Sequence, residues 1–425
     1  MQYTVAMLVV LLLSIPMVIT GQQTPKPWLR EKERARYETL RSSGLEALYN
    51  LDYEKARQNF KQIAQLYPHH PAGPKLLAAS LWIKTLYQSR RLQTSLYNSE
   101  TFYAEGEDKV DPKIVEEFRT LTRDAKRLSE ARLRQYPRDI EALDFLAATA
   151  GLRASFLEAV ERKHFAALRE GSEAVDRHKD VLKLDPTYID AELTIGIYEY
   201  VIGSLPLPIR LLVGITGARG SKKRGLERLE RVVKEGRWTR DDAKSALLLL
   251  YTREGRYRDI VPIARELGSK YPRNYIFRLE EAKALIAVAE EERKANNPAA
   301  AAQAEKEALK TFEDLLNDRA LRDTVGRALD LIHFKFGEVL MTAGYADRAA
   351  KEFMTATQAA HADPGMVTMA HLYAARAFDV AGKRNEALAQ YQKVLDRPNV
   401  YAAHDQAKRG LREPYRQESA RNVGG

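Results

Sequence analysis

Apolar residues recur at intervals of three and four along most of the chain, which is the period of an amphipathic α-helix. Residues 37–68 show the pattern most clearly, because Leu40, Gly44 and Ala47 share one face of a first expected helix. Stretches in which apolar and polar residues alternate between turn residues, as they do in strands, are absent from residue 28 onward. The pattern therefore predicts an all-α protein.

A second helix is expected in the same stretch. Ala56, Phe60 and Ala64 recur every four residues, residues 50–52 form the turn before them, and Pro68 ends the helix. Small residues where two helices touch, an aromatic ring between the helices and a terminal proline resemble the tetratricopeptide repeat, a helical hairpin of about 34 residues. The resemblance implies a right-handed α-solenoid, in which each repeat buries its apolar face against its neighbours.

The same spacing divides the rest of the chain into three groups of repeats. Residues 31–137 form an N-terminal group with long helices, and residues 138–272 form a central group with an insertion at 203–220. Residues 273–412 form a C-terminal group with a capping helix, and residues 413–425 are expected to be a flexible tail.

Glycines mark the turns inside several repeats. Gly255, Gly344 and Gly382 each stand between the two helices of a repeat, where a residue with positive φ is favoured. Gly344 and Gly382 also belong to two repeats that match one another with a constant shift of 38 residues. We expect these repeats to have the same backbone geometry.

The N-terminus has the character of a targeting segment. Residues 5–20 are apolar and uncharged, which fits a signal-peptide core and falls short of the ~20 residues that span a bilayer comfortably. Residues 1–21 are therefore predicted to be a signal peptide and residues 22–30 a linker, so the protein is expected to be periplasmic or secreted. No Lys or Arg precedes the apolar run, which leaves an uncleaved membrane anchor as the alternative.

Composition narrows the chemistry. The chain has no cysteine, which excludes disulfides, thiol catalysis and thiolate metal sites. Its net charge is +10, but Lys and Arg alternate with Asp and Glu along most helices, which favours an ordinary solvated surface. No nucleic-acid partner is expected.

Motifs that mark catalytic or metal sites are also missing from the sequence. The glycine-rich stretch 214–222 lacks the Gly-Lys-Ser/Thr order of a phosphate loop, and no Gly-x-Ser-x-Gly elbow occurs. His69 and His70 are adjacent, so their side chains point apart rather than toward one metal ion. The sequence predicts a protein that is not an enzyme, with no catalytic residue, no cofactor and no metal.

Residues 190–251 depart from the regular repeat. The segment contains a Ser204-Leu205-Pro206 break followed by a glycine-rich turn and a basic helix, expected over residues 222–234, that opens with Gly225-Leu226. This order resembles the central signature of the tetratricopeptide-repeat protein thirty-nine family, whose yeast members serve in inclusion-body clearance. The sequence departs from that family at Thr216, where an aromatic residue is usual. The resemblance implies an adaptor or lipid-associated role and supplies no catalytic residue.

The repeat architecture favours a scaffold that binds a peptide segment or partner protein in its concave groove. The first helices of the repeats should line this groove. Their exposed positions include Arg41, Tyr49, Arg253, Phe334 and Arg376. The arginines suit a ligand with carboxylates, because a guanidinium grips a carboxylate with two hydrogen bonds.

The alternative is a peripheral membrane or lipid-associated protein that uses residues 205–224. In this hypothesis an apolar stretch dips into an anionic membrane surface beside a basic cluster. The cluster consists of Arg219, Lys222, Lys223 and Arg224, which are also the candidate contacts for a phosphate on the backbone amides at the start of the helix from Lys222. Two structural interpretations compete with this one: the cations belong to a solvated turn, and Leu211, Leu212 and Val213 fill a gap in the solenoid.

Overall fold

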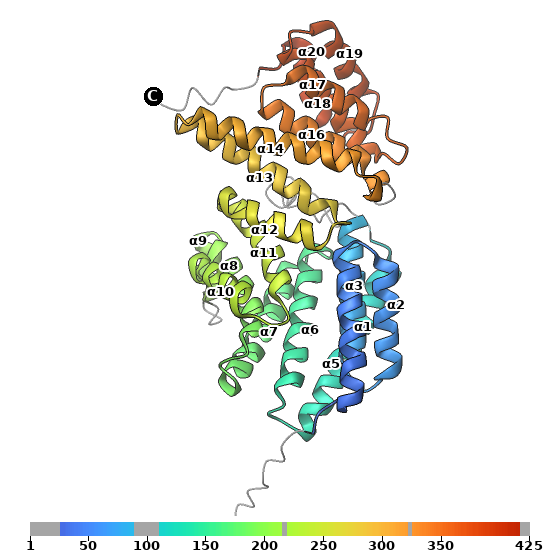
Figure 1. Cartoon of the computed structure of the whole chain (residues 1–425), viewed down its shortest axis with the longest axis vertical. Coiled ribbons are helices and arrows are strands. Elements are labelled where there is room, and N and C mark those ends of the chain that lie inside the picture. The colour runs from blue at the N-terminus through green and yellow to red at the C-terminus, as the bar shows by residue number, and fades with distance from the viewer. Residues whose placement is uncertain (1–25, 89–109, 215–218, 322–324, 417–425) are drawn as a thin grey trace, which may run out of the picture.

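The computed structural model describes residues 26–88, 110–214, 219–321 and 325–416 (Figure 1). Within these ranges the chain contains helices and no strand, which confirms the predicted all-α class. Two helices at a time form hairpins: α1 (Glu31–Tyr49) and α2 (Tyr53–Leu66), α3 (Ala72–Gln88) and α5 (Pro112–Gln135), α6 (Ile140–Ala159) and α7 (His164–Leu184), α8 (Glu192–Ser204) and α10 (Lys222–Glu235), α11 (Arg240–Arg253) and α12 (Tyr257–Lys270), α13 (Tyr275–Lys294) and α14 (Pro298–Asn317), α16 (Leu329–Thr342) and α17 (Ala346–Ala356), and α18 (Pro364–Val380) and α19 (Arg384–Leu395).

The hairpins stack in chain order into a solenoid of tetratricopeptide type. The second helix of each hairpin packs on the first helix of the next, as α2 does on α3 and α12 does on α13. The helix α20 (Ala403–Arg412) covers the last hairpin, as expected of a cap. Along the chain, the short helix α9 (Leu207–Gly214) follows α8 and precedes α10, the two helices of the fourth hairpin. Figure 1 shows the stack running from the blue N-terminal hairpin to the red C-terminal one.

Close packing inside a hairpin depends on small residues beneath aromatic rings. Gly44 of α1 lies against the ring of Phe60 in α2, and Gly337 of α16 lies against Phe353 in α17. A β-carbon at Gly337 would lie 2.6 Å from a ring carbon of Phe353. Ala56 is fully buried on the same helix as Phe60. These contacts agree with the repeat pattern that the sequence predicts.

The turns inside the hairpins use left-handed backbone geometry. Gly255, Gly344 and Gly382 have φ values of 68°, 88° and 74°, which confirms the prediction for these glycines. Two residues with β-carbons, Leu51 at 62° and Asn296 at 58°, occupy corresponding turns. The same turn is therefore made with and without glycine.

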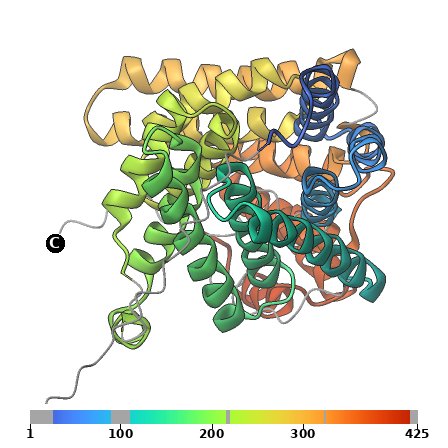
Figure 2. The same ribbon diagram turned by 90° about the horizontal axis from the view of Figure 1, so that it is seen from below.

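The first and fifth hairpins meet although they are far apart in sequence. The Tyr49 hydroxyl donates a hydrogen bond to Asp242 at the start of α11, and its ring stacks on Tyr271 at 4.6 Å between centroids. The Asn274 side chain donates to the Tyr49 carbonyl at 2.8 Å, and Arg273 lies 3.3 Å from the Asp52 carboxylate. We call these contacts together the closure contact. They fold the stack from α1 to α12 back on itself (Figure 2).

The described ends of the chain pack on neighbouring helices. In the predicted linker, Leu29 is buried and the Trp28 ring lies 4.8 Å from the ring of His70. In the predicted tail, the Tyr415 amide donates to Asp379 of α18 at 2.7 Å. The predicted signal peptide at 1–21 and the tail from residue 417 lie outside the described residues.

Candidate functional site

The first helices of the hairpins form the inner side of the curve in the C-terminal repeats. α13 contacts α16 and α16 contacts α18, so the first helices approach one another more closely than the second helices α14, α17 and α19 do. In a curved stack the shorter spacing lies on the concave side. Side chains that project from α13, α16 and α18 away from the second helices therefore line a concave surface.

Three cations lie on this concave surface, one on each successive first helix. They are Lys283 of α13, Lys335 of α16 and Arg376 of α18, and all three keep partial contact with solvent. The Lys335 ammonium lies 2.7 Å from the Glu338 carboxylate, and Lys283 lies 4.0 Å from that of Glu280. We call Lys283, Lys335 and Arg376 the cation row.

Aromatic rings accompany the cation row. The Lys335 ammonium lies 5.7 Å from the ring centroid of Phe334, and the Arg376 guanidinium lies 5.2 Å from that of Tyr373. The rings of Phe334 and Tyr373 are themselves 5.0 Å apart. Arg376 also lies over Tyr415, at 4.9 Å from its ring centroid. The surface thus offers positive charge beside flat apolar groups.

The surroundings perturb these cations in opposite directions. Burial lowers the pKa of Lys283, because crowding by protein disfavours its charged form. Burial acts in the same sense on Lys335, but the neighbouring Glu338 carboxylate outweighs it and raises the pKa of Lys335 overall. A bound carboxylate would therefore stabilise the charged form of Lys283 more than that of Lys335, which already has a carboxylate beside it.

The structure divides the five predicted groove residues among three places. Phe334 and Arg376 lie together beside the cation row, although Phe334 is only 6% exposed and serves mainly as its apolar floor. Tyr49 takes part in the closure contact, and the Arg41 guanidinium lies 4.4 Å from the ring centroid of Trp238. Arg253 is the last residue of α11 and lies near Tyr200 and Glu254. Whether these residues bind a partner stays a prediction.

Sequence reasoning missed Lys283, Lys335 and Tyr373. One signal was available for two of them, because Lys335 and Tyr373 occupy equivalent positions under the shift of 38 residues between the last two repeats. Glu338 and Arg376 correspond in the same way, which places a charged residue on the inner wall of both repeats. Lys283 lies outside the matching repeats and has no such signal.

Charged residues also face the inside of the N-terminal hairpins, but there they oppose one another. Burial lowers the pKa of Lys75 on α3, and the carboxylates of Asp242 and Asp144 partly offset that effect. Asp242 keeps contact with solvent, yet the helices around it desolvate the carboxylate enough to raise its pKa. The Asp144 carboxylate lies 3.3 Å from the ring nitrogen Nε2 of His178. This surface carries mixed charge and no row of one sign.

The four cations predicted to contact an anion or membrane differ in their partners. Lys222 lies 2.8 Å from the Glu254 carboxylate, and Arg224 lies 3.4 Å from that of Glu199. The Lys223 side chain is 85% exposed, and its ammonium lies 3.9 Å from the Glu227 carboxylate, which is a long distance for an ion pair. Arg219 is exposed. Lys222 therefore pairs with a residue at the end of α11 and Arg224 with one of α8, whereas Lys223 pairs within its own helix and, like Arg219, is exposed.

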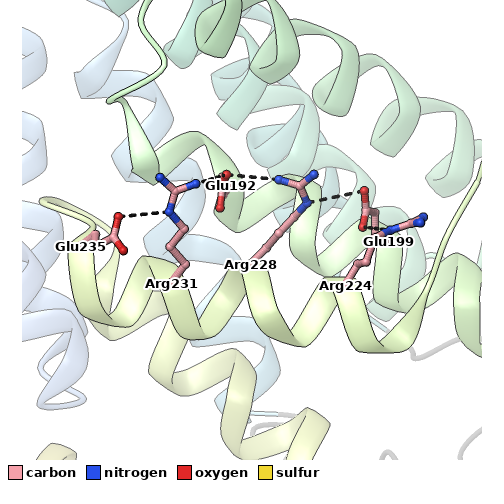
Figure 3. A network of polar contacts seen from close by, with 6 residues as sticks. All are labelled: Glu192, Glu199, Arg224, Arg228, Arg231 and Glu235. Atoms are coloured by element: carbon pink, nitrogen blue, oxygen red, sulfur yellow. Dashed lines mark hydrogen bonds and ion pairs between the residues drawn. The ribbon is translucent and has the colours of Figure 1, made fainter.

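Arg224 belongs to a line of ion pairs that joins α8 to α10 (Figure 3). Glu192 of α8 is buried and accepts hydrogen bonds from Arg228 at 3.2 Å and Arg231 at 3.0 Å. Figure 3 shows Glu199 between Arg224 and Arg228, with Glu235 at the far end beside Arg231. The network fixes the two helices that flank the insertion.

The apolar part of the insertion forms the helix α9, and its side chains are exposed. Leu207, Ile209 and Leu211 expose 58%, 44% and 65% of their surface. The interpretation that Leu211 fills a gap in the solenoid is therefore wrong, because most of its side chain is exposed. The side chains of residues 212 and 213 lie outside the description.

A cavity of about 660 Å³ opens at one end of the last two hairpins, between α17, α18 and α19. His371 lines it and donates from Nδ1 to the Gln390 side-chain oxygen at 2.8 Å. Burial lowers the pKa of His371, which keeps the ring neutral. Lys393 and Arg397 also line the cavity.

The described ranges lack two kinds of feature. They contain no group of three His, Asp or Glu side chains placed to hold a metal ion. None of their helices has the length and apolar character needed to cross a bilayer.

Comparison with known proteins gives structural similarities alone. No protein-family model and no curated protein sequence matches this chain. Human IFIT1, solved as a dimer with PPP-AAAA, is 15% identical over 90% of this chain and 86% of its own, with a TM-score of 0.43. Yeast Tom70 is 12% identical over 90% of this chain and 89% of its own, with a TM-score of 0.34.

Values this low carry no argument about ligand or activity. The fold class rests on the helices and stacking described above. The resemblance of the central segment to the tetratricopeptide-repeat protein thirty-nine family rests on its sequence motifs and stays a prediction. The chain is similar in architecture to helical-repeat proteins of the tetratricopeptide type.

Proposed function

We propose that this protein is an exported, non-catalytic scaffold that holds an extended acidic segment of a partner protein on the concave surface of its C-terminal repeats. The observation that carries the proposal is the cation row. Lys283, Lys335 and Arg376 lie on three successive first helices, on one side of the stack and beside the rings of Phe334 and Tyr373.

The spacing of the row suits an extended chain rather than a compact ligand. Neighbouring helices in a stack lie about 8–10 Å apart, which is close to the span of three residues of extended peptide. A segment that crosses the first helices could therefore present one acidic side chain to each cation, with intervening residues on the rings. Lysine and arginine both bind carboxylates, and the arginine can do so with two hydrogen bonds.

A binding assay with defined peptides tests this proposal. The probe is an extended peptide with glutamate at every third position, and a peptide with lysine at those positions serves as the ligand control. Substituting both Lys335→Gln and Arg376→Gln should weaken binding of the acidic peptide at least tenfold, because two charge-assisted hydrogen bonds are lost. Fluorescence anisotropy at low ionic strength measures the change.

The matched control removes two positive charges elsewhere. Lys306 and Lys310 lie on α14, the second helix of its hairpin, and Lys306→Gln with Lys310→Gln should leave peptide binding unchanged. If both double variants bound the acidic peptide equally weakly, the effect would come from net charge and not from the position of the cations. Failure of the acidic peptide to bind the native chain any better than the basic one would rule out the proposed ligand class.

Export is the second part of the proposal and rests on the apolar, uncharged run at 5–20. Terminal sequencing of the protein from its native source should find a chain that begins near residue 22. An intact Met1 in a membrane fraction would show that the apolar run is an uncleaved membrane anchor rather than a signal peptide. This result would not affect the binding proposal.

A further inference from the structure

Exposed apolar side chains are concentrated around the insertion. The described residues include ten large apolar side chains that are exposed, and five of them lie between residues 197 and 211. These five are Ile197 and Val201 on α8 and Leu207, Ile209 and Leu211 on α9. Single exposed apolar residues are normal on a protein surface, but a cluster of this kind marks an interaction site.

A sixth exposed residue lies at the same end of the neighbouring hairpin. Phe165 exposes 79% of its surface near the start of α7. Gly171 of α7 lies against Tyr198 of α8. Because α7 and α8 run in opposite directions, Phe165 lies toward the end of α8 from which α9 departs.

The insertion is also free of negative charge. Between Glu199 and Glu227 the chain has no acidic residue and five basic ones. Arg210, Arg219 and Lys223 are exposed, whereas Lys222 and Arg224 pair with carboxylates of the hairpin. The apolar helix is therefore flanked by cations that face solvent.

The hairpin that carries α9 is complete without it. Gly196 of α8 and Gly225 of α10 lie so close that a β-carbon at Gly225 would come 2.6 Å from the Gly196 carbonyl oxygen. Gly203 and Gly220, at the two ends of the insertion, are also in contact. Figure 2 shows α9 standing apart from the stacked helices. The insertion is thus an excursion from a closed base, and Leu207, Ile209 and Leu211 contribute little to the core.

We propose that α9 and its basic flank dock the protein on the surface of an anionic lipid bilayer. Leu207 and Leu211, which lie one turn apart on the same face of α9, enter the interface between headgroups and acyl chains, while Arg219 and Lys223 contact the lipid phosphates. A short apolar helix beside cations has the two properties that peripheral membrane binding needs, namely apolar area and attraction to anionic lipid. The exposed cations beside α9 favour a bilayer that contains anionic lipids over one made of uncharged lipids.

A probe attached to α9 reports docking directly. The chain has no cysteine, so Leu211→Cys in the full-length protein gives a single site for an environment-sensitive fluorophore. With vesicles of phosphatidylcholine and phosphatidylglycerol, the emission should shift to the blue and be quenched by brominated acyl chains. Val380→Cys, at an exposed apolar position on α18, is the matched control and should show neither change.

The local probe matters because residues 5–20 could bind vesicles by themselves. Any such binding would not move the fluorophore at residue 211 into the interface. Substituting Arg219→Ser and Lys223→Ser in the labelled protein should weaken partitioning about 30-fold, since each cation near an anionic surface contributes about fivefold. Lys408→Ser with Arg412→Ser, on α20, removes the same charge and should have little effect.

Three results would overturn the inference. The probe at residue 211 could remain in water when anionic vesicles are bound. Vesicles of phosphatidylcholine alone could give the same shift, which would remove the role of the cations. The shift could also arise without lipid as protein concentration rises, together with a dimer in sedimentation equilibrium, and α9 would then be an interface between two copies of the chain.

Discussion

At the scale of single residues, the turn inside each hairpin decides which residue types the chain can use there. A residue with a β-carbon pays about 1–2 kcal/mol for left-handed backbone geometry, and glycine does not. Gly255, Gly344 and Gly382 have nothing within 4 Å of the place where a β-carbon would stand. These three glycines are favoured by backbone geometry alone, whereas Gly44 and Gly337 are required by the ring that covers them.

Substituting Gly344→Ala therefore isolates the backbone cost. We expect it to lower the free energy of unfolding by about 1–2 kcal/mol, because φ is 88° at this position and the added methyl group meets no neighbour. Chemical denaturation measures the change. Gly268→Ala on α12, where a β-carbon would make ordinary contacts of 3.7 Å or more, should be neutral or slightly stabilising. Equal losses in the two variants would contradict the role assigned to φ.

The difference between these two kinds of glycine shows what the sequence could predict. The three turn glycines were identified from their place between two periodic segments, because a turn is a local feature. The residues of the cation row were harder to find, because the repeat pattern specifies the faces where helices pack and says little of the exposed inner face. Only Arg376 and Phe334 were recognised, and Lys283 needed the arrangement of three helices in space.

At the scale of elements, α8 and α10 cross in close contact at Gly196 and Gly225, and the ion pairs of Figure 3 run along this pair of helices. Glycines at the crossing let the two backbones approach, Tyr200 and Leu229 pack beside them, and the polar network adds directional contacts between the helices. Glu192 is central, because it is buried and accepts from two arginines. A buried carboxylate in such a position is costly to lose, since its partners stay behind.

We expect Glu192→Gln to lower the free energy of unfolding by about 1–3 kcal/mol, because the amide keeps the shape but loses the charge that two guanidinium groups share. Glu235→Gln at the exposed end of the network should change it by less than about 0.5 kcal/mol. Thermal unfolding at low and high salt compares the two. A larger effect at Glu235 would show that exposure does not set the strength of these pairs.

The insertion marks the limit of prediction for whole elements. The helix after it was expected from residue 222 and begins there, because Ser221 caps it and apolar residues follow at helical spacing. The helix α9 was not foreseen, since two prolines and a run of adjacent apolar residues give no helical period. Its exposure could not be read from composition, because an apolar run is equally compatible with burial.

At the scale of the whole molecule, the closure contact gives the solenoid a shape that its repeat pattern does not specify. Tyr49, Asp242, Tyr271 and Asn274 come from the first hairpin, the fifth hairpin and the loop after it. No local pattern marks them, because the residues that meet are separated by 193 to 225 positions in the chain. Only the accumulated curvature of the intervening repeats brings them together.

Removing the polar part of this contact should open the N-terminal half. In the double variant Tyr49→Phe with Asn274→Asp, the two hydrogen bonds are lost, while most of the ring stacking and the cap that residue 274 provides for Ile276 remain. We expect a larger radius of gyration in small-angle scattering and unchanged helix content in circular dichroism. Tyr257→Phe on α12 is a control outside the contact. A scattering curve identical to that of the native chain would show that the hydrogen bonds do not hold the closure.

The closure contact also has a consequence for how the chain folds. In a solenoid each repeat is stabilised only by its neighbours, so unfolding can begin at either end and spread gradually. A contact between the first and fifth hairpins ties these hairpins into one cooperative unit and raises the mean sequence separation of native contacts. The N-terminal half should then fold slowly and unfold in a single sharp transition. The hairpins from α16 onward should open independently of it, as measured by hydrogen exchange.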